Sequence, residues 1–302
     1  MHPSNTLIND NVANAKPFGI SAALITPFTR DGALDAAAGG RQAARVIAAG
    51  AEGVTLCGTT GEGASLTRAE RAKLIDGVLD AGVAAEAVTL CLCATAAEDA
   101  ASQARDGLER GIRRFLATPP FYFKGVPDAG LEAWFGALIE RLDAASVELI
   151  LYHIPKVTGT PLSPALVRRL KDRFGPAIRG VKDSSGSWSG AQGFLKARDL
   201  SVMIGDERLL AGAASLGGSG SISGLANLVP AQVRATHETG TANAGINALV
   251  VAVIENGGTA MIKALAAKLF DEPGLAAMRA PNVAADPARA DEIIDQVLRP
   301  ML

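Results

Sequence analysis

Short apolar runs alternate with longer amphipathic stretches from residue 19 to about residue 235. The apolar runs have the length and β-branched content of buried strands, and the stretches between them repeat apolar positions at helical spacing. The pattern predicts eight strands, at Gly19–Thr26, Gly53–Cys57, Val88–Cys93, Arg114–Thr118, Glu148–His153, Ile178–Lys182, Val202–Gly205 and Gly220–Ser223. It also predicts helices at Ala36–Ala49, Ala97–Arg110, Asp128–Leu142 and Ser163–Phe174, and one that begins at a capping box over Thr67–Glu70.

Strands that alternate with helices in this way form a parallel sheet, and eight of them predict a closed (β/α)8 TIM barrel over residues 17–235. An open, doubly wound sheet is the alternative, but no Gly-x-Gly-x-x-Gly turn follows the first strand. After Pro230 the pattern becomes helix upon helix, at Ala231–Glu238, Ala244–Asn256, Thr259–Leu269 and Ala288–Leu298. We therefore expect an N-terminal tail over residues 1–16 and a small C-terminal helical extension over residues 236–302, which braces the barrel and contributes to subunit contacts.

Composition and charge restrict the possible partners. The chain is 48% hydrophobic and 20% charged, which is typical of a globular protein, and 29 basic against 31 acidic residues give a net charge of −2. Such a balance gives no electrostatic reason to expect nucleic acid or a membrane surface as partner. Residues 1–16 have no apolar segment of the kind found in secretory signals, and the run Ala248–Ile254 is shorter than the roughly 20 residues of a membrane span. These features predict a cytoplasmic protein.

Cysteine and histidine residues give little support for a metal site. The three cysteines, Cys57, Cys91 and Cys93, lie in apolar runs, where we interpret them as small buried side chains rather than as disulfides or metal ligands. The three histidines include one in the tail, so no ligand cluster is expected and the protein is predicted to need no metal or other cofactor. His153 is expected to pack on the outer side of its strand.

Reactive side chains follow the predicted strands at the end where barrel active sites lie. Lys182 ends the sixth strand and precedes a loop of small residues, so its amine is expected to project into the barrel mouth. An amine attacks a carbonyl only when it is unprotonated, and burial among apolar walls favours that form. The alternative is a lysine that reaches solvent or pairs with Asp183. Tyr152 ends the fifth strand and Tyr122 follows the fourth, where either phenol can relay protons or serve a structural role.

Two glycine-rich segments accompany these residues. Gly58-Thr59-Thr60-Gly61-Glu62-Gly63 follows the second strand, and its backbone N–H and hydroxyl donors suit a carboxylate, with Thr60 placed to pass a proton to Tyr152. The alternative is a tight turn without chemistry; a nucleotide P-loop is disfavoured because Gly-Lys-Ser/Thr is missing. The glycine-rich eighth strand is expected either to resemble the phosphate site that follows late strands of many barrels or to let a backbone carbonyl, such as that of Ile222, approach a substrate. Gly58 and Ser184 complete the expected substrate-binding set.

In this order, Gly58-Thr59-Thr60-Gly61-Glu62, Tyr152-x-x-Pro155 and Gly180-Val181-Lys182-Asp183 resemble the dihydrodipicolinate synthase / N-acetylneuraminate lyase family, from about Pro17 to the C-terminal helices. The resemblance implies a metal-independent class I aldolase mechanism in which Lys182 forms a Schiff base and Tyr152 is the acid/base. It further implies that Thr59 and Thr60 hold the pyruvate carboxylate, with Thr60 in the relay, and that Tyr122 completes the relay in a neighbouring subunit. Family members are commonly tetramers built from tight dimers, so a homotetramer is expected.

One position departs from the family pattern. Dihydrodipicolinate synthases carry an arginine two residues after the proline, where it binds the carboxylate of the aldehyde substrate, and this chain has Val157 there. Lys156 is adjacent and is expected to point the other way. We therefore expect a lyase or aldolase that acts on pyruvate and an aldehyde, or on a 2-keto-3-deoxy sugar acid. A 4-hydroxy-tetrahydrodipicolinate synthase, which condenses pyruvate with aspartate semialdehyde, is the alternative. A non-catalytic barrel that binds a 2-oxo acid is the alternative of another class.

Overall fold

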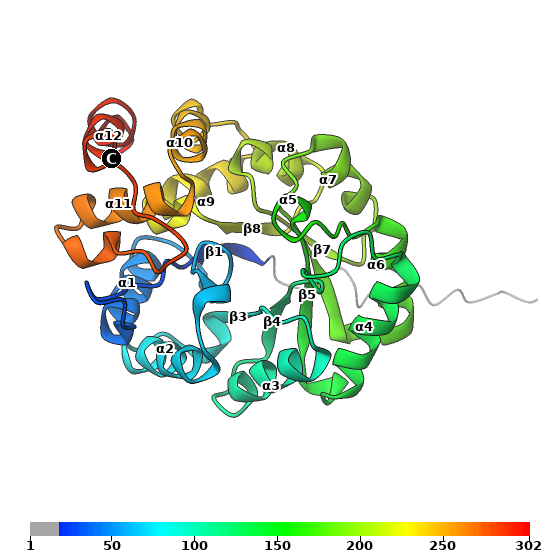
Figure 1. The fold of residues 1–302 in the computed structure, drawn as a ribbon. Helices are drawn as coiled ribbons and strands as arrows, with labels where there is room; N and C mark the ends of the chain where they lie inside the picture. The colour runs from blue at the N-terminus through cyan, green and yellow to red at the C-terminus, as the bar shows by residue number, and fades with distance from the viewer. Residues whose placement is uncertain (1–17) are drawn as a thin grey trace, which may run out of the picture.

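The computed structural model describes residues 18–302, and the tail expected over residues 1–16 lies outside this range. Eight parallel strands form a closed barrel in chain order, which confirms the predicted (β/α)8 architecture. The strands are β1 (Gly19–Ala23), β2 (Gly53–Leu56), β3 (Val88–Leu92), β4 (Arg114–Ala117), β5 (Glu148–His153), β6 (Ile178–Asp183), β7 (Ser201–Ile204) and β8 (Gly220–Ser223). Figure 1 shows the helices arranged around this barrel.

The helices that follow β1 to β4 are α1 (Ala36–Ala48), α2 (Arg68–Asp80), α3 (Ala97–Leu108) and α4 (Asp128–Glu140). Those that follow β5 to β8 are α5 (Pro155–Thr158), α6 (Pro164–Phe174), α7 (Trp188–Leu195), α8 (Leu210–Ser215) and α9 (Pro230–Thr239). The predicted capping box is present, because Thr67 accepts the Glu70 N–H and the Glu70 carboxylate accepts the Thr67 N–H. Such reciprocal bonds satisfy N–H groups that a helix start leaves unpaired.

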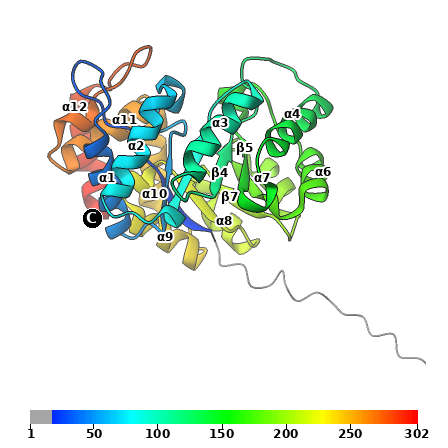
Figure 2. The same ribbon diagram turned by 90° about the horizontal axis from the view of Figure 1, so that it is seen from below.

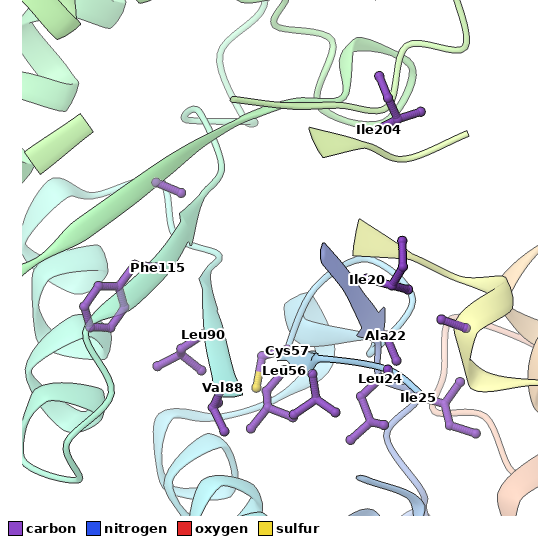
Figure 3. Close-up of a cluster of buried hydrophobic side chains, with 14 of the residues drawn as sticks. Ile20, Ala22, Leu24, Ile25, Leu56, Cys57, Val88, Leu90, Phe115 and Ile204 are labelled. Atoms are coloured by element: carbon purple, nitrogen blue, oxygen red, sulfur yellow. The ribbon is translucent and has the colours of Figure 1, made fainter. Parts of the chain in front are cut away.

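Two layers of apolar side chains surround the strands. The inner layer fills the barrel and is formed by Phe18, Ala23, Cys91, Leu116, Ile150, Tyr152, Ile154, Met203 and Ile222. The outer layer packs between strands and helices, and Figure 3 shows part of it, including Ile20, Leu56, Leu90 and Phe115. Because successive side chains of a strand point to opposite faces, this arrangement decides which residues can reach the barrel mouth.

The C-terminal extension consists of α10 (Ala244–Glu255), α11 (Thr259–Leu269) and α12 (Pro287–Ile293), with a wider helical turn over Ile294–Leu298. These helices gather beside α1 on one side of the barrel, away from α4 and α6 (Figures 1 and 2). The eighth helix of the barrel, α9, runs to Thr239, four residues past the boundary expected after residue 235. Gly240, in a left-handed conformation, ends that helix, and the extension begins after it.

No single helix within residues 18–302 is long and apolar enough to cross a membrane; α10 and α11 reach the threshold only together, and they are bent by 118°.

Candidate active site

Lys182 and Tyr152 face each other across neighbouring strands inside the barrel. They are register partners in the β5–β6 pair, so both side chains point to the inner face. Lys182 is 5% exposed and Tyr152 2%, and the Lys182 Nζ lies 3.1 Å from the Tyr152 hydroxyl. The Thr59 hydroxyl lies 3.3 Å from the same phenol on its other side. An amine, a phenol and a hydroxyl therefore form a continuous hydrogen-bonded chain at the barrel mouth.

The alternative interpretation of Lys182 as an ion-paired or solvent-reaching lysine does not hold. In the part of the chain that the structure describes, Lys182 has no carboxylate partner within salt-bridge distance. Asp183 points to the outer face, where it receives the Ser185 N–H at 2.8 Å and lies 4.0 Å from His153 Nε2. The pleat of β6 thus separates the amine from the carboxylate next to it.

His153 packs on the outer side of β5, as expected. Its Nδ1 accepts the Leu162 N–H at 3.0 Å, and its ring meets that of Phe194 on α7 edge-on. Burial lowers the pKa of His153, and the nearby Asp183 opposes this effect only in part. The neutral ring belongs to the packing between β5 and the outer helices.

The loop after β2 needs its glycines and carries two unusual backbone positions. Cys57 and Glu62 both have left-handed backbone, with φ of 58° and 50°, which costs roughly 1–2 kcal/mol for each non-glycine residue. A side chain at Gly63 would place its Cβ 1.8 Å from the Cys57 carbonyl oxygen, and one at Gly61 would lie 2.8 Å from the Leu24 oxygen. The tight turn and the candidate chemistry are therefore both present in one loop.

Thr59, not Thr60, is the loop residue that contacts Tyr152. The sequence predicts that Thr60 passes a proton to Tyr152, whereas the hydroxyl within 3.3 Å of the phenol is that of Thr59. The reason is the left-handed turn at Cys57, because it removes the alternation that would otherwise say which of two adjacent hydroxyls points inward. Thr60 lines the cavity beside the same groups.

A cavity of about 350 Å³ opens above Lys182 and Tyr152. The polar part of its wall contains Ser184, Asp206, Arg208 and Lys156. The apolar part comes largely from the C-terminal extension and contains Ile222, Leu225, Val250, Val253, Ile254 and Ile262. The structure thus brings the expected Thr59, Thr60, Ile222 and Ser184 to one cavity with Lys182. Gly58 instead lines a neighbouring cavity of about 450 Å³, together with Cys91 and Cys93.

The position of Lys156 also differs from expectation. Lys156 lines the cavity above Lys182, whereas Val157 is 59% exposed and borders the neighbouring cavity. The expectation that Lys156 points away assumed a continuing strand, but the short helix α5 begins at Pro155. Successive side chains of a helix diverge by about 100° rather than alternating between two faces. A positive charge therefore stands at the cavity even though the family arginine is absent.

Sequence reasoning missed three polar residues that follow β7. Asp206, Glu207 and Arg208 line the cavity, and Arg208 is held by the Asp206 carboxylate at 2.7 Å. Glu207 is 5% exposed and accepts the Ser223 hydroxyl and the Leu225 N–H, and burial raises the pKa of its carboxyl. A signal was available, since polar residues directly after a barrel strand lie at the active-site end.

Tyr122 is not brought to the other site residues within this chain. It lies on the loop after β4, is 76% exposed, and meets the ring of Phe123 in an edge-on contact, with ring centroids 5.6 Å apart. Residues 18–302 contain no cluster of three or more His, Cys, Asp or Glu side chains with metal-binding geometry. Cys57 and Cys91 are buried, and burial raises the pKa of both thiols.

Comparison with known proteins agrees with this geometry. A lyase from Chloroflexus aurantiacus described as DapA-like and uncharacterized is 33% identical over 74% of this chain and 75% of its own length. A 4-hydroxy-tetrahydrodipicolinate synthase from Synechococcus sp. WH7803 is 35% identical over 74% of this chain and 73% of its own. The crystal structure of dihydrodipicolinate synthase from Agrobacterium tumefaciens superposes with a TM-score of 0.90 at 40% identity, covering 93% of this chain and 100% of that one.

The sequence signature of one enzyme family covers nearly the whole chain, from residue 16 to residue 287. This range includes all eight strands and the first two helices of the extension, together with every site residue described above. Family and relatives place the chain among enzymes of the lyase class. The chain therefore belongs to the Dihydrodipicolinate synthetase family.

Proposed function

We propose that Lys182 attacks the carbonyl carbon of a 2-oxo acid, with pyruvate as the substrate or product. The amine adds to the carbonyl to give a carbinolamine, which loses water and leaves an imine between Nζ and the former carbonyl carbon. The oxygen that departs must be protonated, and the Tyr152 hydroxyl, 3.1 Å from Nζ, is placed to supply that proton. This contact between a buried amine and a buried phenol is the single observation that carries the proposal.

Once formed, the imine withdraws electrons from the neighbouring carbon. In the synthetic direction, a proton leaves the methyl carbon of pyruvate, and the resulting enamine attacks an aldehyde to form a carbon–carbon bond. In the cleavage direction, the same bond breaks, the aldehyde leaves, and water releases pyruvate from Lys182. Tyr152 moves the proton in each direction, and Thr59 at 3.3 Å is the next group in the relay. The imine is the electron sink, so the proposed reaction needs no metal and no other cofactor.

The residues that line the cavity suggest which groups contact each part of the substrate. The Thr60 hydroxyl and the N–H groups of the loop, from Gly58 onward, are the proposed donors to the carboxylate, and the Ile222 carbonyl closes the other side. Ser184 and Asp206 line the polar wall, where they suit the hydroxyl groups of a 2-keto-3-deoxy sugar acid. We therefore propose cleavage or synthesis of such an acid, or condensation of pyruvate with an aldehyde.

A second candidate function is 4-hydroxy-tetrahydrodipicolinate synthase, which condenses pyruvate with aspartate semialdehyde. Val157 argues against it, because a valine cannot pair with the carboxylate of that aldehyde. Lys156 favours it, because its position at the cavity offers a positive charge one residue earlier in the chain. The 35% identity to a Synechococcus protein of that name also supports this candidate.

The quaternary structure is also part of the proposal. A phenol that is 76% exposed suits the family arrangement in which Tyr122 enters the relay of a neighbouring subunit, and a homotetramer built from tight dimers is proposed on this ground. A cytoplasmic location is proposed with it. Small-molecule 2-oxo acids and aldehydes are the proposed partners, with no role for nucleic acid or membranes.

Borohydride reduction in the presence of pyruvate tests the proposal. The expected result is a stable adduct on Lys182, found by mass spectrometry of the peptide that contains it. Lys182→Ala should give no adduct and no turnover while its unfolding curve keeps a single cooperative transition, and EDTA should leave the activity unchanged. Absence of the adduct on the unmodified enzyme would contradict the Schiff-base mechanism. Pyruvate binding without adduct or turnover would identify a non-catalytic binding barrel.

A further inference from the structure

A buried ion pair joins the C-terminal extension to the loop after β2. Lys263 on α11 is 0% exposed, and its Nζ donates to the Glu62 carboxylate at 2.7 Å and to the Thr26 carbonyl oxygen at 2.9 Å. The second Glu62 oxygen accepts the Arg279 N–H at 3.2 Å and the Asn282 side-chain amide at 3.1 Å. Two segments of the extension, helix α11 and the loop that contains Arg279 and Asn282, therefore converge on one carboxylate in the barrel mouth.

Glu62 closes the turn that carries Thr59. The Glu62 N–H donates to the Thr59 carbonyl oxygen at 3.1 Å, and the Thr59 hydroxyl contacts Tyr152 at 3.3 Å. The left-handed backbone of Glu62 is strained for a residue with a side chain, so it persists only where surrounding contacts hold it. The contacts at its carboxylate, with Lys263 foremost, hold Glu62 from outside the loop, and Arg71 holds the next residue by donating to the Gly63 carbonyl oxygen at 3.1 Å.

Lys263 supports the same loop by a second route. The Thr26 carbonyl oxygen accepts the hydrogen bond from Lys263 Nζ. The Thr26 hydroxyl in turn donates to the Gly61 carbonyl oxygen at 2.6 Å. One ammonium group thus fixes Glu62 directly and Gly61 through Thr26. Both residues follow Thr59 by no more than three positions, so the backbone of the turn is held in place, although the Thr59 side chain itself is exposed.

Stability alone is a weak reason for this ion pair. Removing two charges from water is unfavourable, and apolar residues of similar volume commonly stabilise a core as well as a buried ion pair does. The site of Lys263 is already apolar in part, since its Nζ lies 4.6 Å from the centre of the Phe28 ring. An apolar pair, however, cannot form the directional hydrogen bonds that fix the position of Glu62 in its strained turn.

We infer that Lys263 and Glu62 are positioning residues, whose ion pair keeps the Thr59 hydroxyl against Tyr152 and thereby makes proton relay depend on the C-terminal extension. The inference rests on the proposed Schiff-base function. The contacts of the Lys263 ammonium lie with Glu62, Thr26 and the Phe28 ring, away from Lys182, so it acts through Thr59 rather than on the substrate.

A double-mutant cycle between Lys263 and Thr59 tests the inference. Lys263→Met should lower kcat by at least about tenfold in the unmodified enzyme, because the relay loses its alignment. In a Thr59→Val background the same change should lower kcat by less than about twofold, because residues that act through one another are not additive. Lys268→Met, on the same helix but in a surface pair with Asp291, is the matched control and should leave kcat unchanged.

Two further measurements keep the outcomes distinct. Borohydride trapping with pyruvate is carried out first on the unmodified enzyme; absence of the adduct would overturn the proposed function and this inference together. With the adduct present, equal losses in both backgrounds, or a loss of unfolding free energy without a change in kcat, would overturn the inference alone. The double variant Glu62→Gln/Lys263→Met leaves no buried unpaired charge, so it replaces Lys263→Met in the cycle if the single variant does not fold. Its loss of kcat should likewise be smaller in the Thr59→Val background.

Discussion

Replacing Tyr152 by phenylalanine removes one oxygen from the centre of the proposed relay. The ring is 2% exposed and packs in the inner layer of the barrel, so its apolar contacts remain. The lost contacts are those with Lys182 at 3.1 Å and Thr59 at 3.3 Å. At about 1 kcal/mol for each net hydrogen bond, the free energy of unfolding should fall by no more than about 2 kcal/mol.

The expected catalytic loss from Tyr152→Phe is larger than this stability loss. A positioned acid/base contributes about 10²–10⁴-fold, which raises the barrier by about 2.7–5.4 kcal/mol. The assay measures kcat for pyruvate release from 2-keto-3-deoxy acids, together with the rate of adduct formation with pyruvate and borohydride. Both rates should fall while the final amount of adduct on Lys182 stays the same. A folded variant with kcat within about tenfold of the unmodified enzyme would refute the assigned role.

Three further predictions concern charge, assembly and pH. Lys156→Gln should raise KM about tenfold for aldehyde substrates with an anionic end and leave the trapping of pyruvate unchanged. Lys196→Gln, which changes an exposed lysine, is the control. A KM equal to that of the unmodified enzyme would exclude a contact between Lys156 and the anionic group. Tyr122→Phe should lower kcat without changing the unfolding midpoint, and an unchanged kcat would remove Tyr122 from the relay. The Arg279 contact lowers the pKa of Glu70 from 4.5 to about 2, so this pair stabilises the fold above about pH 4.5 and is lost toward pH 2. Glu70→Gln should therefore flatten the acid side of the stability curve, and parallel curves would contradict this.

The strand order was predictable because barrel strands are buried on both sides. Each apolar run in the sequence is long enough to be recognised, and predicted and observed strands begin at the same residue in seven of eight cases. The first strand was predicted to end at Thr26, because the chain stays buried up to that residue. Strand pairing ends earlier, however, and β1 stops at Ala23. Helix α7 was missed, since glycine and serine residues dominate its start, although Ser187 caps the helix by accepting the Gly190 N–H at 3.2 Å.

Site residues were predictable where they follow a strand and unpredictable where distant segments meet. Lys182 and Tyr152 were found because strand ends determine their position. The pair of Glu62 with Lys263 joins residues 201 positions apart, and no local pattern carries such a contact. Lys156 was misplaced because its face was inferred from strand alternation, although the chain had already turned into α5 at Pro155.

Because side chains alternate along β5 and β6, the proposed catalytic residues of these strands lie on one face of the sheet and their neighbours in sequence lie on the other. Tyr152 and Lys182 point inward, while the residues that follow them, His153 and Asp183, point outward and face each other at 4.0 Å. A carboxylate beside Lys182 on the inner face would favour the ammonium form of the lysine, and an ammonium ion cannot attack a carbonyl. A shift of one residue in β6 alone would bring Asp183 inward against Tyr152 and turn Lys182 toward the helices. The register of these two strands is thus itself a requirement of the proposed chemistry, because it keeps the Asp183 carboxylate on the face opposite the Lys182 amine.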